Sequence, residues 1–148
     1  MIDSYSSGRN ELFAQFGTST AGINTIAGYA IPVIYQGVET GDKMPTDKFW
    51  LRVSQQTVLE SQATLSGNDL KRRYTTDGLA FVQIFIPKAP SSNYAKGLEI
   101  ANLIKKAFRG KQTNGCMWFR NVWIQELPPE DAWLRINVVS EYQYDEIG

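Results

Sequence analysis

The chain has 148 residues, 43 % of them apolar and 20 % charged, and its 15 basic and 15 acidic side chains give a formal net charge of zero. This length suits a single globular domain. No run approaches the roughly 20 apolar residues that a membrane-spanning helix requires, and the first residues lack the pattern of a secretory signal. The zero net charge argues against a protein that grips a phosphate backbone, because each neutralised phosphate needs a cation.

The chain contains no histidine and one cysteine, Cys116. The missing histidine removes the commonest general base and the commonest transition-metal ligand, and a lone cysteine forms no internal disulfide. No phosphate-binding loop, nucleophile elbow or dinucleotide fingerprint is present. The carboxylates of Glu130 and Asp131 fall in a predicted turn, where solvated acids are routine. We therefore expect no enzymatic activity, metal site or cofactor.

Residues 1–17 predict a short amphipathic helix. Asp3 or Ser4 is placed to cap its start, and Gly17 to close it. The residues that fall near one face of this helix are Ile2, Tyr5, Arg9, Leu12, Phe13 and Phe16.

Residues 18–48 predict loops around one short strand. The run TSTAGINTIAG is small and polar, which favours an irregular loop. In the next run, AIPVIYQG, Pro32 is compatible with an edge strand or the start of one.

Residues 49–86 predict a long β-hairpin with its turn at Ser66–Asp69. The first arm alternates, so Leu51, Val53, Thr57 and Leu59 are expected on one face. The distal part, roughly residues 59–76, is polar and charged, and we expect it to project beyond the core.

Residues 91–109 predict a helix, and residues 117–144 a second hairpin. In the helix, apolar residues repeat at three- and four-residue steps and Ser91 or Ser92 is placed to cap the start. The segment PPED is expected to form the turn of the second hairpin. Together these elements predict a single-domain α+β fold, with a mainly antiparallel sheet of four to five strands, helices on one face and a long projecting hairpin.

The segment LKRRYTTDGLAFVQIFIP joins a cationic start to an apolar end. In a strand, Lys71 and Arg73 share one face while Arg72 lies on the other, so the three cations do not form one phosphate-binding cluster. A surface for another protein is favoured over a DNA grip, and both remain open. From Leu79 to Ile86 both faces are apolar, so the second face must be covered by the N-terminal segment or by another subunit.

The charges are distributed unevenly along the chain. Residues 88–111 hold six cations against one acid (+6 − 1 = +5), and residues 126–148 hold six acids against one cation (−6 + 1 = −5). Such poles either meet between identical subunits or form two solvated faces that never touch.

The order and spacing of several runs resemble the tail terminator proteins of long-tailed bacteriophages. These runs are PVIYQG, FWLRVSQQ, KRRYTTDGLAFVQIFIP, GLEIANLIKKAFRG, WFRNVWIQE and WLRINVVSEYQYDE. The resemblance covers nearly the whole chain after about residue 30, and the loop TSTAGINTIAG is longer than the family pattern.

This resemblance implies a non-enzymatic virion protein at the junction of tail and neck, assembled in the host cytoplasm. Members form a ring, commonly a hexamer, that docks on the tail tube, stops its growth and offers a surface to the neck complex, while genomic DNA passes through the lumen without specific binding. The alternatives are another neck or head-completion adaptor and a nucleic-acid-binding module. The candidate interface residues are Lys71, Arg72, Arg73, Tyr74, Leu79, Phe81, Phe85, Trp133 and Arg135.

Overall fold

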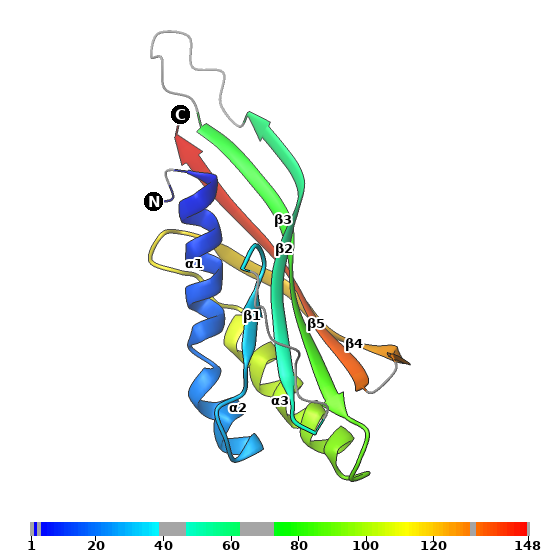
Figure 1. The fold of residues 1–148 in the computed structure, drawn as a ribbon. Coiled ribbons are helices and arrows are strands. Elements are labelled where there is room, and N and C mark those ends of the chain that lie inside the picture. The colour runs from blue at the N-terminus through cyan, green and yellow to red at the C-terminus, as the bar shows by residue number, and fades with distance from the viewer. Residues whose placement is uncertain (1, 3, 39–46, 63–72, 131–132, 148) are drawn as a thin grey trace, which may run out of the picture.

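The computed structural model describes residues 2, 4–38, 47–62, 73–130 and 133–147. They form one α+β domain with three helices and five strands, which confirms the predicted fold class (Figure 1). The helices are α1 (Tyr5–Gly17), α2 (Thr20–Ala27) and α3 (Asn93–Phe108), and the strands are β1 (Val33–Tyr35), β2 (Trp50–Gln62), β3 (Arg73–Pro87), β4 (Trp118–Glu130) and β5 (Trp133–Ile147). None of the described helices is long and apolar enough to cross a membrane.

The five strands form one mixed sheet in the order β1-β2-β3-β5-β4. The short strand β1 pairs parallel to β2 at one edge, directly after Pro32 as predicted, and all other pairs are antiparallel. The strands β2 and β3 are the two arms of the first predicted hairpin. Its turn at 66–69 lies outside the described residues, so the projecting tip stays a prediction.

The helix α1 begins as the sequence predicts. Ser4 is its N-cap, and the Ser4 hydroxyl oxygen accepts a hydrogen bond from the backbone N–H of Ser7 at 3.1 Å. Asp3, the alternative cap, lies outside the described residues. The helix ends at Gly17, with Thr18 as its C-cap.

The predicted loop over residues 18–28 is wrong, because α2 forms there. Ile23 is fully buried, and Gly22 lies so close to α3 that an added Cβ would stand 2.7 Å from a Leu103 methyl group. Gly28 ends the helix in the left-handed conformation, with φ of 82°. Packing against α3 therefore overrides the weak helix propensity of this polar run.

The core lies between the three helices and the face of the sheet that they cover, here called the inner face. Residues from all three helices and four strands fill it with side chains that are almost fully buried. Its members include Leu12, Phe16, Ile23, Leu51, Val53, Val82, Ile84, Ile100, Ile104, Phe119, Ile136 and Val138.

A β-bulge in β2 overturns part of the predicted alternation. Leu51 and Val53 face the core as expected. The register with β3 then shifts between Thr57 and Leu59, so Val58 is an extra residue. An extra residue reverses the side of every residue after it. Leu59 is therefore opposite Asp77 and 56 % exposed, whereas the sequence placed it with the core.

The C-terminal half confirms α3 and the antiparallel pairing of β4 with β5, with two local corrections. Ser92 is the N-cap of α3, but its side chain makes no capping bond. The Asn93 amide instead donates to the carbonyls of Pro87 and Ala89. The prolines of PPED lie within the outermost strand β4, where a missing N–H is tolerated, and Asp131 lies outside the described residues.

Candidate protein-binding surface

The sheet face opposite the helices, here called the outer face, is the candidate site. The helix α3 packs on β3, β4 and β5, and α1 and α2 pack against α3, so all three helices lie on the inner side (Figure 1). No described helix covers the outer face. The strand register places all four tryptophans on it: Trp50 opposite Phe85, Trp118 opposite Gln143, Trp123 opposite Val139 and Trp133 opposite Pro87.

One end of the outer face is a compact aromatic cluster. The rings of Trp50 and Phe85 are stacked with centroids 3.8 Å apart, and Trp133 meets both edge-on at 5.8 and 6.2 Å. The Arg52 guanidinium lies over both stacked rings, 5.5 Å from Trp50 and 5.4 Å from Phe85. Stacking and cation–π contacts of this kind are favourable. They leave Trp50 only 5 % and Phe85 only 4 % exposed without any described helix above them.

This cluster contains polar atoms that the described part of the chain does not satisfy. The indole N–H groups of Trp50 and Trp133 are buried without a hydrogen-bond partner there, as is the side-chain oxygen of Asn137 farther along β5 on the same face. A buried polar group that loses its water partner without replacement costs about 1–3 kcal/mol. The outer face is therefore less completely satisfied than the inner one.

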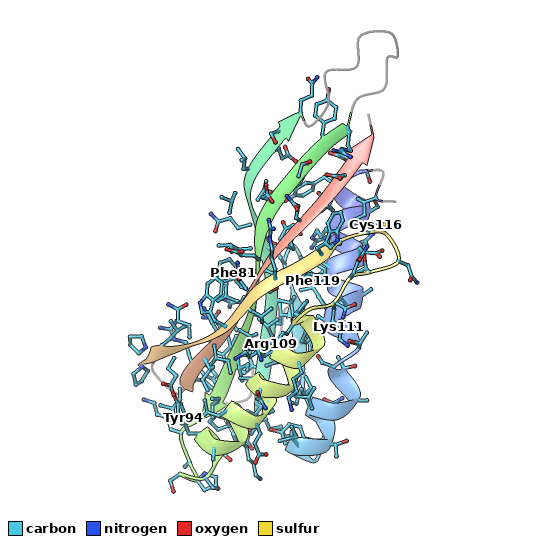
Figure 2. All side chains as sticks on the ribbon, turned by 180° about the vertical axis from the view of Figure 1, so that it is seen from behind. Phe81, Tyr94, Arg109, Lys111, Cys116 and Phe119 are labelled. Atoms are coloured by element: carbon cyan, nitrogen blue, oxygen red, sulfur yellow. The ribbon has the colours of Figure 1, made fainter. Side chains whose placement is uncertain are left out.

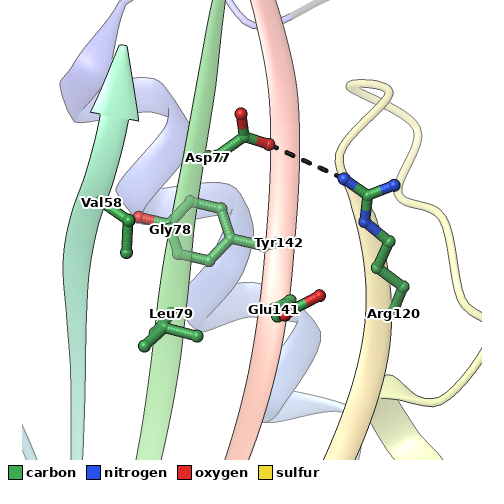
Figure 3. A pocket seen from close by; sticks show the side chains of 7 residues that line it. All are labelled: Val58, Asp77, Gly78, Leu79, Arg120, Glu141 and Tyr142. Carbon is green, nitrogen blue, oxygen red and sulfur yellow. Dashed lines mark ion pairs between the residues drawn. The ribbon is translucent and has the colours of Figure 1, made fainter.

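The middle of the outer face holds a shallow pocket of about 400 Å³ (Figure 3). Asp77, Arg120 and Glu141 supply its charges, and the Arg120 Nη2 lies 3.8 Å from the Asp77 Oδ1. Glu141 accepts a hydrogen bond from the Asn121 amide at 2.7 Å. The remaining lining residues are Val58, Gly78, Leu79 and Tyr142. This mixture of apolar and solvated charged groups suits contact with a protein side chain.

Gly78 in this pocket is required by close packing. An added Cβ would stand 2.6 Å from the backbone oxygen of Gln56 and would collide with the hydroxyl oxygen of Tyr142, which crosses Gly78 on the inner side. Burial raises the pKa of Tyr142 to about 12, because the apolar surroundings disfavour the charged phenolate. This hydroxyl lies 3.4 Å from the side-chain oxygen of Gln55, a donor–acceptor pair that ties β5 to β2.

The structure brings together five of the nine predicted interface residues. Their strand positions place Leu79, Phe81, Phe85, Trp133 and Arg135 on the outer face. The predicted cover of this face by the N-terminal segment is wrong, because α1 belongs to the helical layer. The Arg135 guanidinium donates to the carbonyl of Pro128 at 3.2 and 3.3 Å, which holds it along the surface of its own chain.

The other four predicted residues belong to the start of β3 or precede it. The Arg73 Nε lies 3.8 Å from an Asp145 carboxylate oxygen at the far end of the outer face. Tyr74 is the next residue, opposite Glu146, and so points to the other face. Lys71 and Arg72 lie outside the described residues.

Trp118 and Trp123 are surface residues that the sequence did not single out as interface candidates. They are five residues apart, an odd spacing that places them on opposite faces of a regular strand. A register shift between Arg120 and Val122, where Asn121 adopts φ of 51°, brings them to the same face. They are 38 % and 41 % exposed. No residue-type pattern announces this bulge, so the sequence offered no signal for the pair.

The basic side chains of residues 88–111 and the acidic side chains of residues 126–148 are distributed differently in the structure. Lys105, Lys106, Arg109 and Lys111 gather at the C-terminal end of α3, two of them labelled in Figure 2, and no described carboxylate lies within ion-pair distance of them.

The acids of the C-terminal segment are instead divided between the two faces. Glu126 faces α3 and accepts a hydrogen bond from the Tyr94 hydroxyl at 2.6 Å, which raises the pKa of Tyr94 to about 12. Glu141 and Asp145 belong to the outer face. The described acids therefore form no single patch to oppose the basic helix end.

Comparison with known proteins bears on the fold. No protein-family model and no curated protein sequence matches the chain. One similar solved structure, whose name states no function, shares 17 % sequence identity with a TM-score of 0.61 and covers 90 % of this chain and 93 % of its own. A second belongs to the virion of a native gene transfer agent particle, with 18 % identity, a TM-score of 0.50 and coverage of 96 % and 99 %. At these identities the likeness shows that the chain shares a known α+β fold over nearly its whole length.

Proposed function

We propose that this chain is a structural virion protein and, more specifically, a tail terminator that forms a ring. In this proposal each copy contacts other copies of the chain, and the ring contacts the tail tube protein and a neck protein. The observation that carries the proposal is the outer face, which holds all four tryptophans and has no described helix above it. Support also comes from the resemblance in sequence to tail terminators and from the likeness in fold to a chain of a gene transfer agent virion.

The chemistry of the outer face fits protein contacts. Tryptophan and arginine are enriched at the centres of protein interfaces, where rigid rings fill pockets of the partner. Here Trp118 and Trp123 supply exposed rings, and Arg52 already lies against the aromatic cluster. In this proposal the chain is not an enzyme and requires no cofactor, and DNA crosses the lumen without specific binding, consistent with the zero net charge.

Deleting the gene from the phage that encodes it tests this proposal. A terminator stops polymerisation of the tube, so we expect overlong tails by electron microscopy and tails of normal length when the intact chain is supplied in trans. A neck or head-completion adaptor acts after the tube is finished. Free tails of normal length would therefore contradict the terminator role and favour the adaptor.

A nucleic-acid-binding module is the second candidate, favoured by the four cations at the end of α3 that have no described ion-pair partner. Phosphate contacts made by such a cluster weaken steeply with salt. A DNA gel shift that disappears as salt is raised would support this candidate, and no shift at low salt would remove it.

A further inference from the structure

We infer that copies of this chain join edge to edge, with an open edge of β2 in one copy against an open edge of β4 in the next. This inference rests on the proposed ring and names the surfaces that build it. It differs from an oligomer formed through the outer face, because edge pairing extends the sheet and leaves the outer face accessible.

The first surface is the part of β2 that extends beyond β1, residues 56–61, here called the open β2 edge. The strand β1 pairs only with Leu51 to Val53. Gln36 extends this cover slightly, since its backbone N–H donates to the Val53 carbonyl and its side-chain oxygen accepts from the Gln55 N–H, both at 2.9 Å. Beyond Gln55, β2 continues beside β3, but no described strand pairs with its other side. Among the described residues, the outward backbone groups of this edge have no strand partner.

The open β2 edge has two of the devices that protect sheet edges, a bulge and the charged Glu60, and lacks two others. Natural edges carry prolines or lysines that prevent strand addition, and residues 56–61 contain neither. The bulge instead leaves Val58 63 % and Leu59 56 % exposed. Tyr5 of α1 is 46 % exposed and lies on the inner side of β2, with its hydroxyl 3.3 Å from the Thr57 hydroxyl. An exposed apolar edge of this kind fits an extended partner strand.

The second surface is the outer side of β4, the last strand of the sheet, over residues 120–127, here called the open β4 edge. The start of β4 is covered by its own chain, since the Phe119 N–H donates to the Lys111 carbonyl and Gln112 pairs with Trp118. Pro128 and Pro129 follow at the other end and cannot donate to a further strand. Between these limits β4 pairs only with β5 among the described strands, and Trp123 is 41 % exposed.

The distribution of exposed apolar side chains identifies the occupant of each edge as a second copy. Among the described residues, the large apolar side chains that remain exposed are Tyr5, Val38, Val58, Leu59, Trp118 and Trp123. Val58 and Leu59 belong to the open β2 edge, and Trp123 belongs to the open β4 edge at the opposite side of the sheet. One chain therefore carries two strand edges without a described strand partner, each with an exposed apolar side chain, at opposite sides of the sheet.

Strand direction is also compatible with this pairing. Each of the pairs β2–β3, β3–β5 and β5–β4 is antiparallel, so β2 and β4 run in opposite directions. Two copies in the same orientation then place β2 and β4 side by side as an antiparallel pair. The open β2 edge begins at Gln56, which shares a row with Arg120 of β4 through Leu79 and Glu141. From this shared row the open β2 edge and the open β4 edge extend in opposite directions, because the two strands are antiparallel. Neighbouring copies must therefore be shifted along the strand direction for the two edges to meet, as strands are in closed barrels.

The contact joins two different surfaces, which is the kind of interface that generates rings when the rotation closes. Each copy uses both edges at once, and the outer face stays free for the tail tube or the neck protein. A symmetric dimer, in contrast, would pair the open β2 edge with itself.

Site-directed cross-linking distinguishes these arrangements. In a Cys116→Ser background, Ser61→Cys places a thiol at the open β2 edge and Gln125→Cys places one at the open β4 edge, both at exposed positions. A short bis-maleimide is applied to each variant alone and to their mixture, both in solution and in isolated tails. Light scattering gives the oligomeric mass in solution. We expect cross-linked pairs in the mixture and none with either variant alone. A third variant, Asn102→Cys on the exposed side of α3, is expected to cross-link with neither.

The outcomes separate this inference from the proposed function. An oligomer whose mixture gives no cross-link, or in which Ser61→Cys links to itself, overturns the edge-to-edge contact and leaves the ring intact. A chain that remains monomeric both in solution and on tails overturns the ring itself, and the contact with it. As a second variant, Leu59→Asp is expected to abolish the oligomer while the monomer keeps the far-UV circular dichroism spectrum of the unchanged chain, and Asn102→Asp retains the oligomer. An oligomer that survives Leu59→Asp would also overturn the contact.

Discussion

The two faces of the sheet use the same strands in different ways. On the inner face the helices seal side chains such as Leu51 and Ile84, which are fully buried. On the outer face the side chains cover one another, as Arg52 does for Trp50 and Phe85. That cover ends at the sheet edges, where Leu59 and Trp123 remain exposed. The difference indicates that the inner face holds the fold together, while the outer face and its edges are available for other proteins.

Matched truncations in one strand test this difference most strongly. Leu51→Ala empties a closed core position and is expected to lower the free energy of unfolding by about 2–5 kcal/mol. Leu59→Ala removes a side chain that is 56 % exposed and is expected to change it by less than about 0.5 kcal/mol. Urea unfolding of the monomer measures both. Equal losses would show that Leu59 is part of the core and would break the comparison.

A smaller effect is expected from a glycine pair. Gly78→Ala forces a Cβ against the Gln56 carbonyl, so we expect a loss of about 1–3 kcal/mol. Gly17→Ala is the control, because its Cβ would meet nothing within 4 Å in the last turn of α1. That change is expected to stabilise the chain by about 0.5–1 kcal/mol. Thermal unfolding of both variants checks the pair, and a neutral Gly78→Ala would show that β2 and β3 are not tightly apposed there.

Regular periodicity made most of the fold predictable from the sequence. The period-2 alternation of β3 and β5 and the three- and four-residue steps of α3 each carry enough apolar positions to fix a face. The same alternation showed that Phe81 and Phe85 lie on a second apolar face, which the structure places away from the helices. Five of the nine predicted interface residues meet there because they belong to strands whose register follows this rule.

The features that the sequence did not reveal depend on tertiary contacts. The helix α2 forms because Ile23 and Gly22 pack towards the core and α3, not because its residues favour a helix. The bulges at Val58 and Asn121 each reverse the alternation within a strand. They expose Leu59 and align Trp118 with Trp123, and no local residue pattern specifies them. The edge surfaces therefore became visible only in the structure.

Amide hydrogen exchange of the assembled chain against its monomer tests the central claim most directly, namely that the sheet edges and not the helices join the copies. We expect slower exchange in the assembly over residues 56–61 and 120–127, because new interstrand hydrogen bonds protect their outward N–H groups. The helix α2, residues 20–27, is expected to exchange equally in both states. Protection confined to the helices, with both sheet edges unchanged, would contradict the account.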